Sequence, residues 1–428
     1  MSEPLEQIVT AVPGKRSREL AQSLSRHESR NVTYLADDFP IFWESARGAT
    51  VTDVDGNRYI DCTAAFGVAN VGHANPHVTQ AVAEQAERLV HGMGDVHPTE
   101  IRVRLFERLA EILPRELSRA FLATTGSEAV EVALKTAMLA TGRSRFASFH
   151  GAYHGLSFGA LAVGGIDRFR RAFAAALSEP LLLEFPRDGS GISLEQAAQR
   201  THDALEHAGD IAAVIVEPVQ GRAGCFRPIV GYLTALRRIC DDLGILLILD
   251  EIYTGFGRTG RWFAFEREGV IPDVLCIGKA LGSGFPISAA VGTAAVMDAW
   301  PRSTGEALHT STYLGNPIGC AAALATIAEM RRLDLPQRAA RLGNELATRL
   351  RRLRAHQRVA DVRGCGLFWA VQFRGTSVAG VAVKSALARG AIFLQSGVTG
   401  DSITIAPPLT IGREQLLRAV DSLEESLP

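Results

Sequence analysis

Two side chains that could do covalent chemistry follow two apolar runs in the middle of the chain. Asp250 directly follows the run Ile245–Leu249, and Lys279 follows the run Val274–Ile277 after one glycine. The carboxyl ends of parallel strands meet at one edge of a sheet, so the carboxylate and the amine should lie close together. Only four of the 45 basic residues are lysines. Because arginine neither forms an imine nor releases its proton, the lysine at this position predicts covalent chemistry at Lys279.

A third motif could bind an anion. The turn Thr124–Ser127 follows the predicted strand Ala120–Ala123 and leads into a helix. Free amide groups at the helix N-terminus, the helix dipole and the Ser127 hydroxyl would together suit a phosphate group. A plain N-cap without a ligand is the alternative interpretation of the same residues.

Two further segments place polar groups after predicted strands. The segment His150–Gly155, HGAYHG, offers Tyr153 to stack on a planar ligand and two histidines to hydrogen-bond it. Glu217 opens the segment EPVQG after the strand Ala212–Val216. A glycine-rich loop and a structural cap are the alternatives for these two segments.

Two nucleotide-binding alternatives fail on the sequence. An apolar strand ending in Asp250–Glu251 resembles a Walker B strand, but that function needs a GxxxxGK[ST] motif elsewhere. The Gly–Lys pairs at Gly14–Lys15 and Gly278–Lys279 are followed by arginine and alanine. No GxGxxG motif follows the first strand of a βαβ unit, so a dinucleotide enzyme is excluded as well.

One cofactor accounts for these groups together. Pyridoxal phosphate requires a lysine for its aldehyde, a carboxylate for its ring nitrogen, a phosphate site and a ring-stacking side chain. The sequence predicts Lys279, Asp250, Gly126–Ser127 and Tyr153 in these roles. Asp250 would keep the ring nitrogen protonated, because an adjacent anion favours the charged pyridinium. Lys279 would then move the substrate proton as base and acid.

The elements that position these groups follow an alternating pattern. Between residues 120 and 300, short apolar strands alternate with helical segments, which predicts a mostly parallel sheet covered by helices on both faces, an α/β fold. Asp55–Gly56 predicts a hairpin with a type I′ turn, and residues 1–30 form either a first helix or a mobile arm. The predicted strands are Ala120–Ala123, Arg145–Phe149, Ala212–Val216, Ile245–Leu249, Val274–Ile277, Ser288–Val291, Gly366–Phe373 and Ser402–Ile405, and the predicted helices are Pro76–Leu89, Thr99–Leu113 and Pro317–Arg332.

Composition limits the class of protein. A chain of 428 residues is too long for one ordinary core, so a large and a smaller domain are expected. The net charge of −1 gives no electrostatic reason to expect nucleic acid or an anionic membrane as partner. The six cysteines form no CxxC pair, so neither a metal site nor a disulfide framework is predicted. No apolar run approaches the length of a membrane span, which predicts a cytoplasmic protein.

Eight segments follow one another along the chain in a recognisable order: DVDGNRYID, VGHANP, TTGSEAVEVALKTA, HGAYHG, EPVQG, LDEIYTGFGRTG, IGKALGSGFP and TSTYLGNPIGCAAA. In these segments and in their order, the chain resembles the class III (ω-type) aminotransferases of fold type I. The resemblance implies a large cofactor-binding domain over residues 76–320 with a mostly parallel seven-stranded sheet. A smaller α+β domain would combine an N-terminal segment, residues 1–75, with residues 321–428. The resemblance also implies a homodimer with active sites at the interface, and ping-pong transfer from a primary amine to a keto or aldehyde acceptor through a Lys279 aldimine.

The resemblance assigns a cofactor site, and it marks Arg258 as part of a structural segment. Tyr253 stands where the family commonly has glutamine, and a phenol can also donate a hydrogen bond there. The implied cofactor residues are Lys279 for the aldehyde, Asp250 for the ring nitrogen, Gly126, Ser127 and Thr312 of the partner subunit for the phosphate, Tyr153 and Ile252 for the ring faces, His154 beside Tyr153, and Tyr253 near the 3′-oxygen.

Besides Tyr253, two further departures from the family pattern bear on the substrate. The family's EPVQGEGG is EPVQGRAG here, which places Arg222 near the site. Thr404, in SITIAPPL, stands where many members that use glutamate have an arginine that binds the α-carboxylate and that the counterpart of Glu217 masks. Without that arginine, Glu217 would be a buried, unpaired carboxylate that recruits a cation.

We therefore expect an amino donor with a further ammonium group, as in a diamine, an ω-amino acid or an amino sugar. Three alternatives stay open: Arg222 binds the substrate carboxylate, a small α-carboxylate binds elsewhere, or the scaffold supports an epimerase, dehydratase or aminomutase reaction instead.

Overall fold

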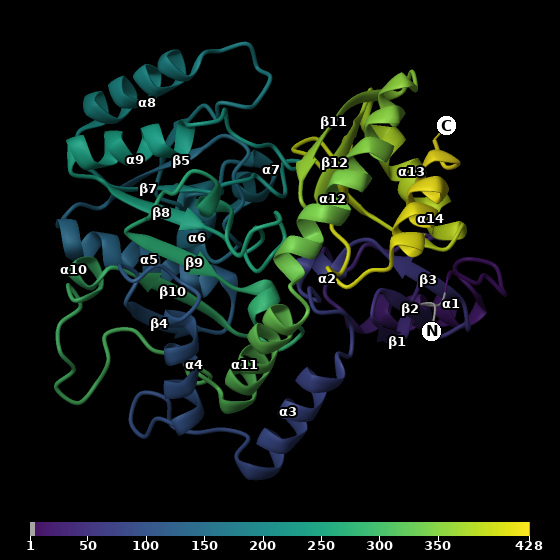
Figure 1. The fold of residues 1–428 in the computed structure, drawn as a ribbon, viewed down its shortest axis with the longest axis horizontal. Coiled ribbons are helices and arrows are strands. Elements are labelled where there is room, and N and C mark those ends of the chain that lie inside the picture. The colour runs from purple at the N-terminus through teal and green to yellow at the C-terminus, as the bar shows by residue number, and fades with distance from the viewer. Residues whose placement is uncertain (1–4, 428) are drawn as a thin grey trace.

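A seven-stranded sheet crosses the larger part of the molecule in the computed structural model, which describes residues 5–427 (Figure 1). Six strands are parallel, and one, β10, runs antiparallel between its neighbours β4 and β9. The mostly parallel seven-stranded sheet is therefore confirmed, and the short β6 adds to the six strands predicted from the pattern. In spatial order the strands are β4 (Arg119–Ala123), β10 (Ser288–Gly292), β9 (Val274–Ile277), β8 (Leu246–Asp250), β7 (Ile211–Val216), β5 (Arg145–Phe149) and β6 (Leu181–Leu183).

Both faces of this sheet are buried, because successive side chains of each strand point to opposite sides. In β8, Leu247 and Leu249 join the main hydrophobic core, whereas Ile248 between them packs into a second cluster with α5. In β9, Leu275 and Cys276 divide in the same way. This arrangement explains why both strands are continuous apolar runs in the sequence.

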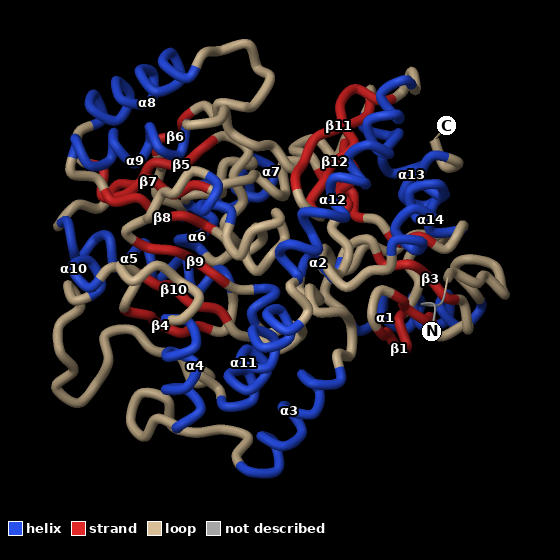
Figure 2. The backbone as a smooth tube through the Cα atoms, in the orientation of Figure 1, coloured by secondary structure: helices blue, strands red, loops and turns tan. Residues whose placement is uncertain are grey.

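Helices cover both faces of the sheet, and Figure 2 shows how they surround the strands. The predicted helices over residues 76–89, 99–113 and 317–332 are present as α3, α4 and α11. The helices of this region are α3 (Pro76–Arg88), α4 (Glu100–Ala110), α5 (Gly126–Thr141), α6 (Phe158–Ala162), α7 (Asp167–Arg170), α8 (Leu194–Ala208), α9 (Tyr232–Leu243), α10 (Ala294–Met297) and α11 (Pro317–Arg332), with short 3-10 turns η1 (Arg171–Ala176), η2 (Ala264–Arg267) and η3 (Lys279–Leu281).

The smaller part of the molecule combines both ends of the described chain. A four-stranded sheet joins three N-terminal strands to β13, which pairs in parallel with β3. A second four-stranded sheet is antiparallel and lies beside it on the right of Figure 1. The elements are α1 (Lys15–His27), β1 (Trp43–Arg47), β2 (Thr50–Asp53), β3 (Arg58–Asp61), α2 (Ala64–Gly67), α12 (Leu335–Arg352), η4 (Leu353–Ala355), β11 (Val359–Cys365), β12 (Phe368–Phe373), α13 (Thr376–Ala388), β13 (Ala391–Ile392), β14 (Leu394–Ser396), β15 (Ser402–Ile405) and α14 (Arg413–Glu424). The domain boundaries at residues 75 and 320 stay predictions, and residues 1–4 of the N-terminal segment lie outside the described residues.

The predicted hairpin is present, but its turn is not type I′. Strands β2 and β3 pair antiparallel, and the Gly56 amide donates to the Asp53 carbonyl at 3.0 Å. Gly56 has φ +87°, whereas a type I′ turn also needs a positive φ at the residue before it. Asp55 instead accepts hydrogen bonds from the amides of Arg16 and Ser17, at 2.7 and 2.9 Å, which fixes the start of α1.

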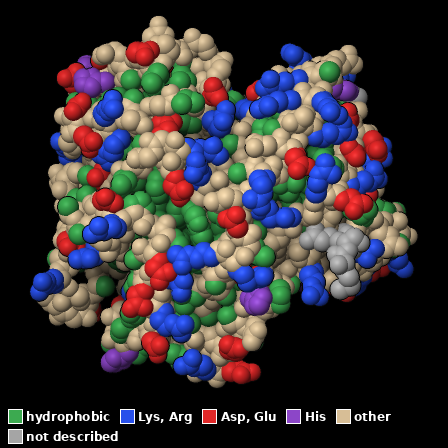
Figure 3. All heavy atoms as spheres, viewed as in Figure 1, with side chains coloured by type: hydrophobic (Ala, Val, Ile, Leu, Met, Phe, Trp, Pro, Cys, Tyr) green, Lys and Arg blue, Asp and Glu red, His purple; other side chains and the backbone are tan. Residues whose placement is uncertain are grey.

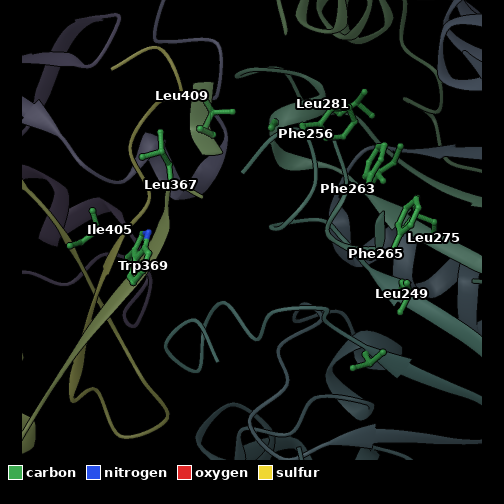
Figure 4. Packing of buried hydrophobic residues seen from close by; sticks show 14 of the residues in the cluster. Leu249, Phe256, Phe263, Phe265, Leu275, Leu281, Leu367, Trp369, Ile405 and Leu409 are labelled. Atoms are coloured by element: carbon green, nitrogen blue, oxygen red, sulfur yellow. The ribbon is translucent and has the colours of Figure 1, made fainter. Parts of the chain in front are cut away.

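One hydrophobic core runs through both parts of the molecule. Leu249 and Phe263, from the large part, belong to the same cluster as Trp369 and Ile405 from the C-terminal sheet, and Figure 4 shows these side chains. On the face in Figure 3, acidic and basic side chains are interspersed. Among residues 5–427, no helix is long and apolar enough to cross a membrane, and the cytoplasmic location stays a prediction.

Candidate active site

Asp250 and Lys279 meet at the carboxyl edge of the large sheet, as their positions after apolar runs predict. Asp250 ends β8, and Lys279 begins the turn after β9, the parallel neighbour of β8. The Lys279 Nζ lies 4.6 Å from the centre of the Tyr253 ring. Burial lowers the pKa of Lys279, and the negative charges of Asp250 and Glu217 oppose this shift. The site therefore favours a neutral, nucleophilic amine more than water does.

Asp250 is held in one orientation by two hydrogen bonds. Its Oδ2 lies 2.7 Å from Nδ1 of His154, and its Oδ1 accepts from the Ile252 amide at 3.0 Å. Asp250 and His154 are both buried. The other ring nitrogen of His154, Nε2, has no hydrogen-bond partner among the described residues. The pair presents a fixed carboxylate at the end of β8.

The N-terminus of α5 offers free amide groups. Thr125 and Glu128 form a capping box, in which the Thr125 hydroxyl accepts from the Glu128 amide and the Glu128 carboxylate accepts from the Thr125 amide. This box does not use the amides of Gly126 and Ser127, which as the first helical residues have no partner within the helix. These two N–H groups and the positive end of the helix dipole make a site for an anion.

Glycines let other segments approach this helix end. A Cβ on Gly155 would lie 2.1 Å from the Ser127 Oγ, and the backbone there has φ +127°. The Ser127 Oγ also accepts from the Leu156 amide at 3.2 Å. A Cβ on Gly126 would lie 3.0 Å from Cδ1 of Ile252. The structure thus places Ile252, Gly126 and Ser127 together.

Glu217 lies beside this cluster as a buried carboxylate. Its Oε1 accepts from the Tyr153 amide and its Oε2 from the Gly221 amide, each at 3.0 Å. Burial raises the pKa of Glu217 to about 7, the Asp250 charge adds to this shift, and His154 and the two amides oppose it. The expected unpaired carboxylate is therefore held by two backbone amides, and burial disfavours its charged form.

Tyr253 is enclosed by close backbone contacts. A Cβ on Gly67 would lie 2.4 Å from its ring, and a Cβ on Gly221 would lie 2.7 Å from it. The Phe368 ring centre is 4.6 Å away. The Tyr253 hydroxyl has no hydrogen-bond partner among the described residues, and burial raises its pKa. A buried, unused donor of this kind is costly unless a ligand binds it.

The segment that carries Gly67 is wound left-handed. Ala64, Ala65, Phe66 and Gly67, which make up α2, have φ values of +47°, +48°, +63° and +76°. The Thr63 hydroxyl accepts from the Ala65 amide at 3.1 Å and fixes the entry to this turn. Phe66 is 60% exposed, so the turn presents a large apolar side chain next to the residue that packs on Tyr253.

Arg258 is fully buried, and its side chain connects distant segments of the chain by hydrogen bonds. Its Nη1 donates to the carbonyls of Leu367 and Pro407 at 2.8 and 2.6 Å, and its Nη2 donates to Asn70 Oδ1. Burial lowers the pKa of Arg258 to about 10. These contacts join the loop after β8 to the N-terminal and C-terminal segments and agree with the structural role expected for this residue.

The residues singled out for the substrate lie in different surroundings. Arg222 is half-buried and donates to the Gln395 carbonyl at 3.0 Å. Thr404 is buried on β15, and its hydroxyl donates to the Ser396 hydroxyl at 2.7 Å instead of meeting Glu217. Thr312 lies in an exposed loop and makes no side-chain hydrogen bond recorded among residues 5–427.

The atoms left without partners fit pyridoxal phosphate. The free amides at Gly126 and Ser127 suit its phosphate, and the unused Tyr253 hydroxyl suits an oxygen acceptor. Lys279 and Asp250, from adjacent strands, suit its aldehyde and ring nitrogen. Sequence reasoning did not single out Gly155, Gly67 or Phe368. Gly155 stands in the motif HGAYHG and could have been found there, whereas nothing in the local pattern marks the other two.

Comparison with known proteins adds the family. Residues 33–427 match the family described as "Aminotransferase class-III". A putrescine aminotransferase of Pectobacterium atrosepticum is 38% identical over 405 residues, covering 93% of this chain and 84% of the relative. An acetylornithine aminotransferase of Methanopyrus kandleri is 39% identical over 391 residues, covering 91% of this chain and 95% of the relative.

Solved structures of transaminases also superimpose on this chain over most of its length. A transaminase from a marine Virgibacillus superimposes with a TM-score of 0.89 at 29% identity, covering 96% of this chain and 98% of the other. An amine transaminase from an uncultivated Pseudomonas species, described as PLP-bound, superimposes with a TM-score of 0.87 at 30% identity, covering 94% and 98%.

Proposed function

Because this chain belongs to the class III aminotransferases, which depend on pyridoxal phosphate, we propose that its amino donor carries a second ammonium group and is a diamine. The wider donor class includes ω-amino acids and amino sugars. The amino group would pass to a keto or aldehyde acceptor in a ping-pong reaction, in which donor and acceptor use the same site in turn. The name of the Pectobacterium relative refers to putrescine, a diamine, which supports the narrower choice.

The single observation that carries this proposal is the environment of Glu217. Its two oxygens each accept one backbone amide, and Glu217 forms no ion pair among residues 5–427. A carboxylate retains lone pairs after accepting one hydrogen bond at each oxygen, so it can still accept from an ammonium group. An ammonium at this position would offset the desolvation that raises the pKa of Glu217.

The residues around Lys279 would perform the transfer. When bound, pyridoxal phosphate supplies the electrophilic carbon and the electron sink that the reaction needs. Lys279 Nζ, with its lowered pKa, would accept the proton from the substrate carbon and return it. Asp250, held by His154 and Ile252, would keep a proton on the ring nitrogen facing it. The Tyr253 hydroxyl, which has no hydrogen-bond partner among residues 5–427, would donate a hydrogen bond to an oxygen of the cofactor.

The phosphate site would be completed in a homodimer by Thr312 of the partner subunit. The segment around Val90 lies against the loop near Thr312, since Asn316 donates to the Val90 carbonyl at 3.1 Å. Val90, Met93 and Tyr313 leave large apolar surfaces exposed there, which favours a second copy of the chain as the partner. Light scattering on the holoenzyme should give about twice 45.9 kDa, and a monomeric mass would contradict this assembly.

A donor screen tests the proposed function. Mass spectrometry should detect amino transfer from diamines more readily than from monoamines of equal length, and Glu217→Gln should reduce this preference. Glu251→Gln is a matched control, because Glu251 is also buried and accepts two backbone amides, from Ala264 and Phe265. Unchanged diamine turnover in Glu217→Gln would contradict the proposal.

A further inference from the structure

Arg222 lies at the edge of the site with most of its donors unused. It directly follows Gly221, whose amide binds Glu217, and its own carbonyl accepts from the Gly397 amide at 3.1 Å. One guanidinium nitrogen, Nη1, donates to the Gln395 carbonyl. An arginine has five N–H donors, and this hydrogen bond uses one of them. The guanidinium group is therefore fixed at Nη1 and keeps further N–H groups for a ligand.

A second cation, Arg168, lies over the ring of Phe169, which neighbours Tyr153 of the same site. Its guanidinium carbon is 4.7 Å from the centre of the Phe169 ring. The Phe169 ring in turn meets the Tyr153 ring edge-on, with centres 5.5 Å apart. The Tyr153 amide binds Glu217, and Glu217 also binds the amide of Gly221, the residue before Arg222, so these contacts connect Arg168 to the segment that carries Arg222.

The two cations lie close enough to affect each other. Burial lowers the pKa of Arg222, and the charge of Arg168 lowers it further, while Tyr153 and Tyr253 oppose the shift. Neither arginine forms an ion pair with a carboxylate within residues 5–427. Arg168 is exposed and Arg222 is half-buried, so an anion that approached this edge of the site would be attracted by both positive charges.

We propose that Arg168 and Arg222 together bind the carboxylate of a 2-oxo acid, the amino acceptor. This inference rests on the proposed ping-pong transfer, in which two substrates of different charge use one site. Glu217 would receive the ammonium tail of the donor, and the arginine pair would receive the carboxylate of the acceptor. Arginine suits this task because its planar N–H groups match both oxygens of a carboxylate. The two charged positions would let the site discriminate two substrates without moving a side chain between them.

Kinetics with charged and uncharged acceptors test the pair. The holoenzyme variants Arg168→Gln, Arg222→Gln and Arg222→Lys are compared with the wild type at a saturating diamine concentration. The acceptors are pyruvate, 2-oxoglutarate and the uncharged butanal. Arg171→Gln is the control, because Arg171 is an exposed arginine three residues after Arg168.

Each glutamine variant should lower kcat/KM for the 2-oxo acids by about tenfold, mostly through KM, and change kcat/KM for butanal less than about twofold. Arg222→Lys should retain part of the preference, and added salt should weaken 2-oxo acid use in the wild type more than in the variants. Equal losses with all acceptors, or no loss with 2-oxo acids, would overturn the inference. Wild-type transfer to butanal but not to 2-oxo acids would also overturn it. No transfer to any acceptor would instead refute the proposed function itself.

Discussion

Replacing Glu217 with glutamine should abolish a pH-dependent preference for diamines over monoamines. The pKa of Glu217 is raised by burial from 4.5 to about 7, so the side chain changes from mostly neutral to mostly charged within the range where the enzyme can be assayed. The ionised fraction rises from about one tenth at pH 6 to about nine tenths at pH 8. If only the carboxylate holds the distal ammonium, the diamine preference rises about tenfold over this interval. An ordinary glutamate would complete the same rise below about pH 6.

The assay is kcat/KM for 1,4-diaminobutane divided by kcat/KM for butylamine, at each pH from 6 to 8.5. This ratio cancels the titration of Lys279 and of the reacting amine, which affect both donors alike. Glutamine keeps the size of the side chain but cannot ionise, so the ratio should be low and independent of pH in Glu217→Gln. A flat ratio in the wild type, or the same rise in the variant, would refute the reasoning. Glu251→Gln, the buried control, should keep the rise.

Three further predictions concern the same region. Lys279→Ala should abolish the visible absorbance that the cofactor has when joined to the lysine, and should lower amino transfer about a thousandfold or more; a persistent band would contradict the assignment of Lys279. Glu251 is fully buried, and burial raises its pKa to about 7. The folded state therefore holds the Glu251 proton more tightly than the unfolded state does. The resulting stabilisation is fully present below pH 4.5 and is lost as the pH rises through 7. This loss amounts to about 3 kcal/mol, so urea unfolding at pH 5 and pH 8 should differ less in Glu251→Gln than in the wild type, and an equal difference would contradict the buried proton. Tyr253→Phe should weaken cofactor binding about tenfold, measured by titration of the absorbance, without lowering the thermal midpoint of the cofactor-free protein, since the hydroxyl has no hydrogen-bond partner among residues 5–427.

The parts of the fold set by local pattern could be predicted from the sequence. Helix α11 begins and ends where predicted, because Asn316 caps it and Pro317 suits its first position. Strands β8 and β9 are continuous apolar runs, and Asp250 and Lys279 follow them at the sheet edge where catalytic groups gather. The order of these runs was enough to bring the two residues together in the prediction.

The features that depend on distant contacts could not be predicted in this way. Strand β6 has only three residues and, in the part of the chain that the structure describes, pairs with β5 alone at the sheet edge, so it leaves no periodic signal. The turn at Gly56 is not type I′. Its neighbour Asp55 instead accepts a hydrogen bond from the amide of Arg16, at the start of α1 and 39 residues earlier in the chain. The surroundings of Glu217 were predicted only in part: its burial was expected from the family resemblance, but its two amide partners come from loops that meet only in the folded chain.

The left-handed turn Ala64–Gly67 has a consequence for protein engineering. Three of its residues carry side chains at positive φ, and each costs about 1–2 kcal/mol relative to a right-handed turn. Glycine at position 65 would therefore raise thermostability, contrary to the usual effect of adding glycine to a protein. The same change would loosen the backbone that carries Gly67, which packs on the Tyr253 ring, so the stabilised enzyme should also accept a broader set of amines.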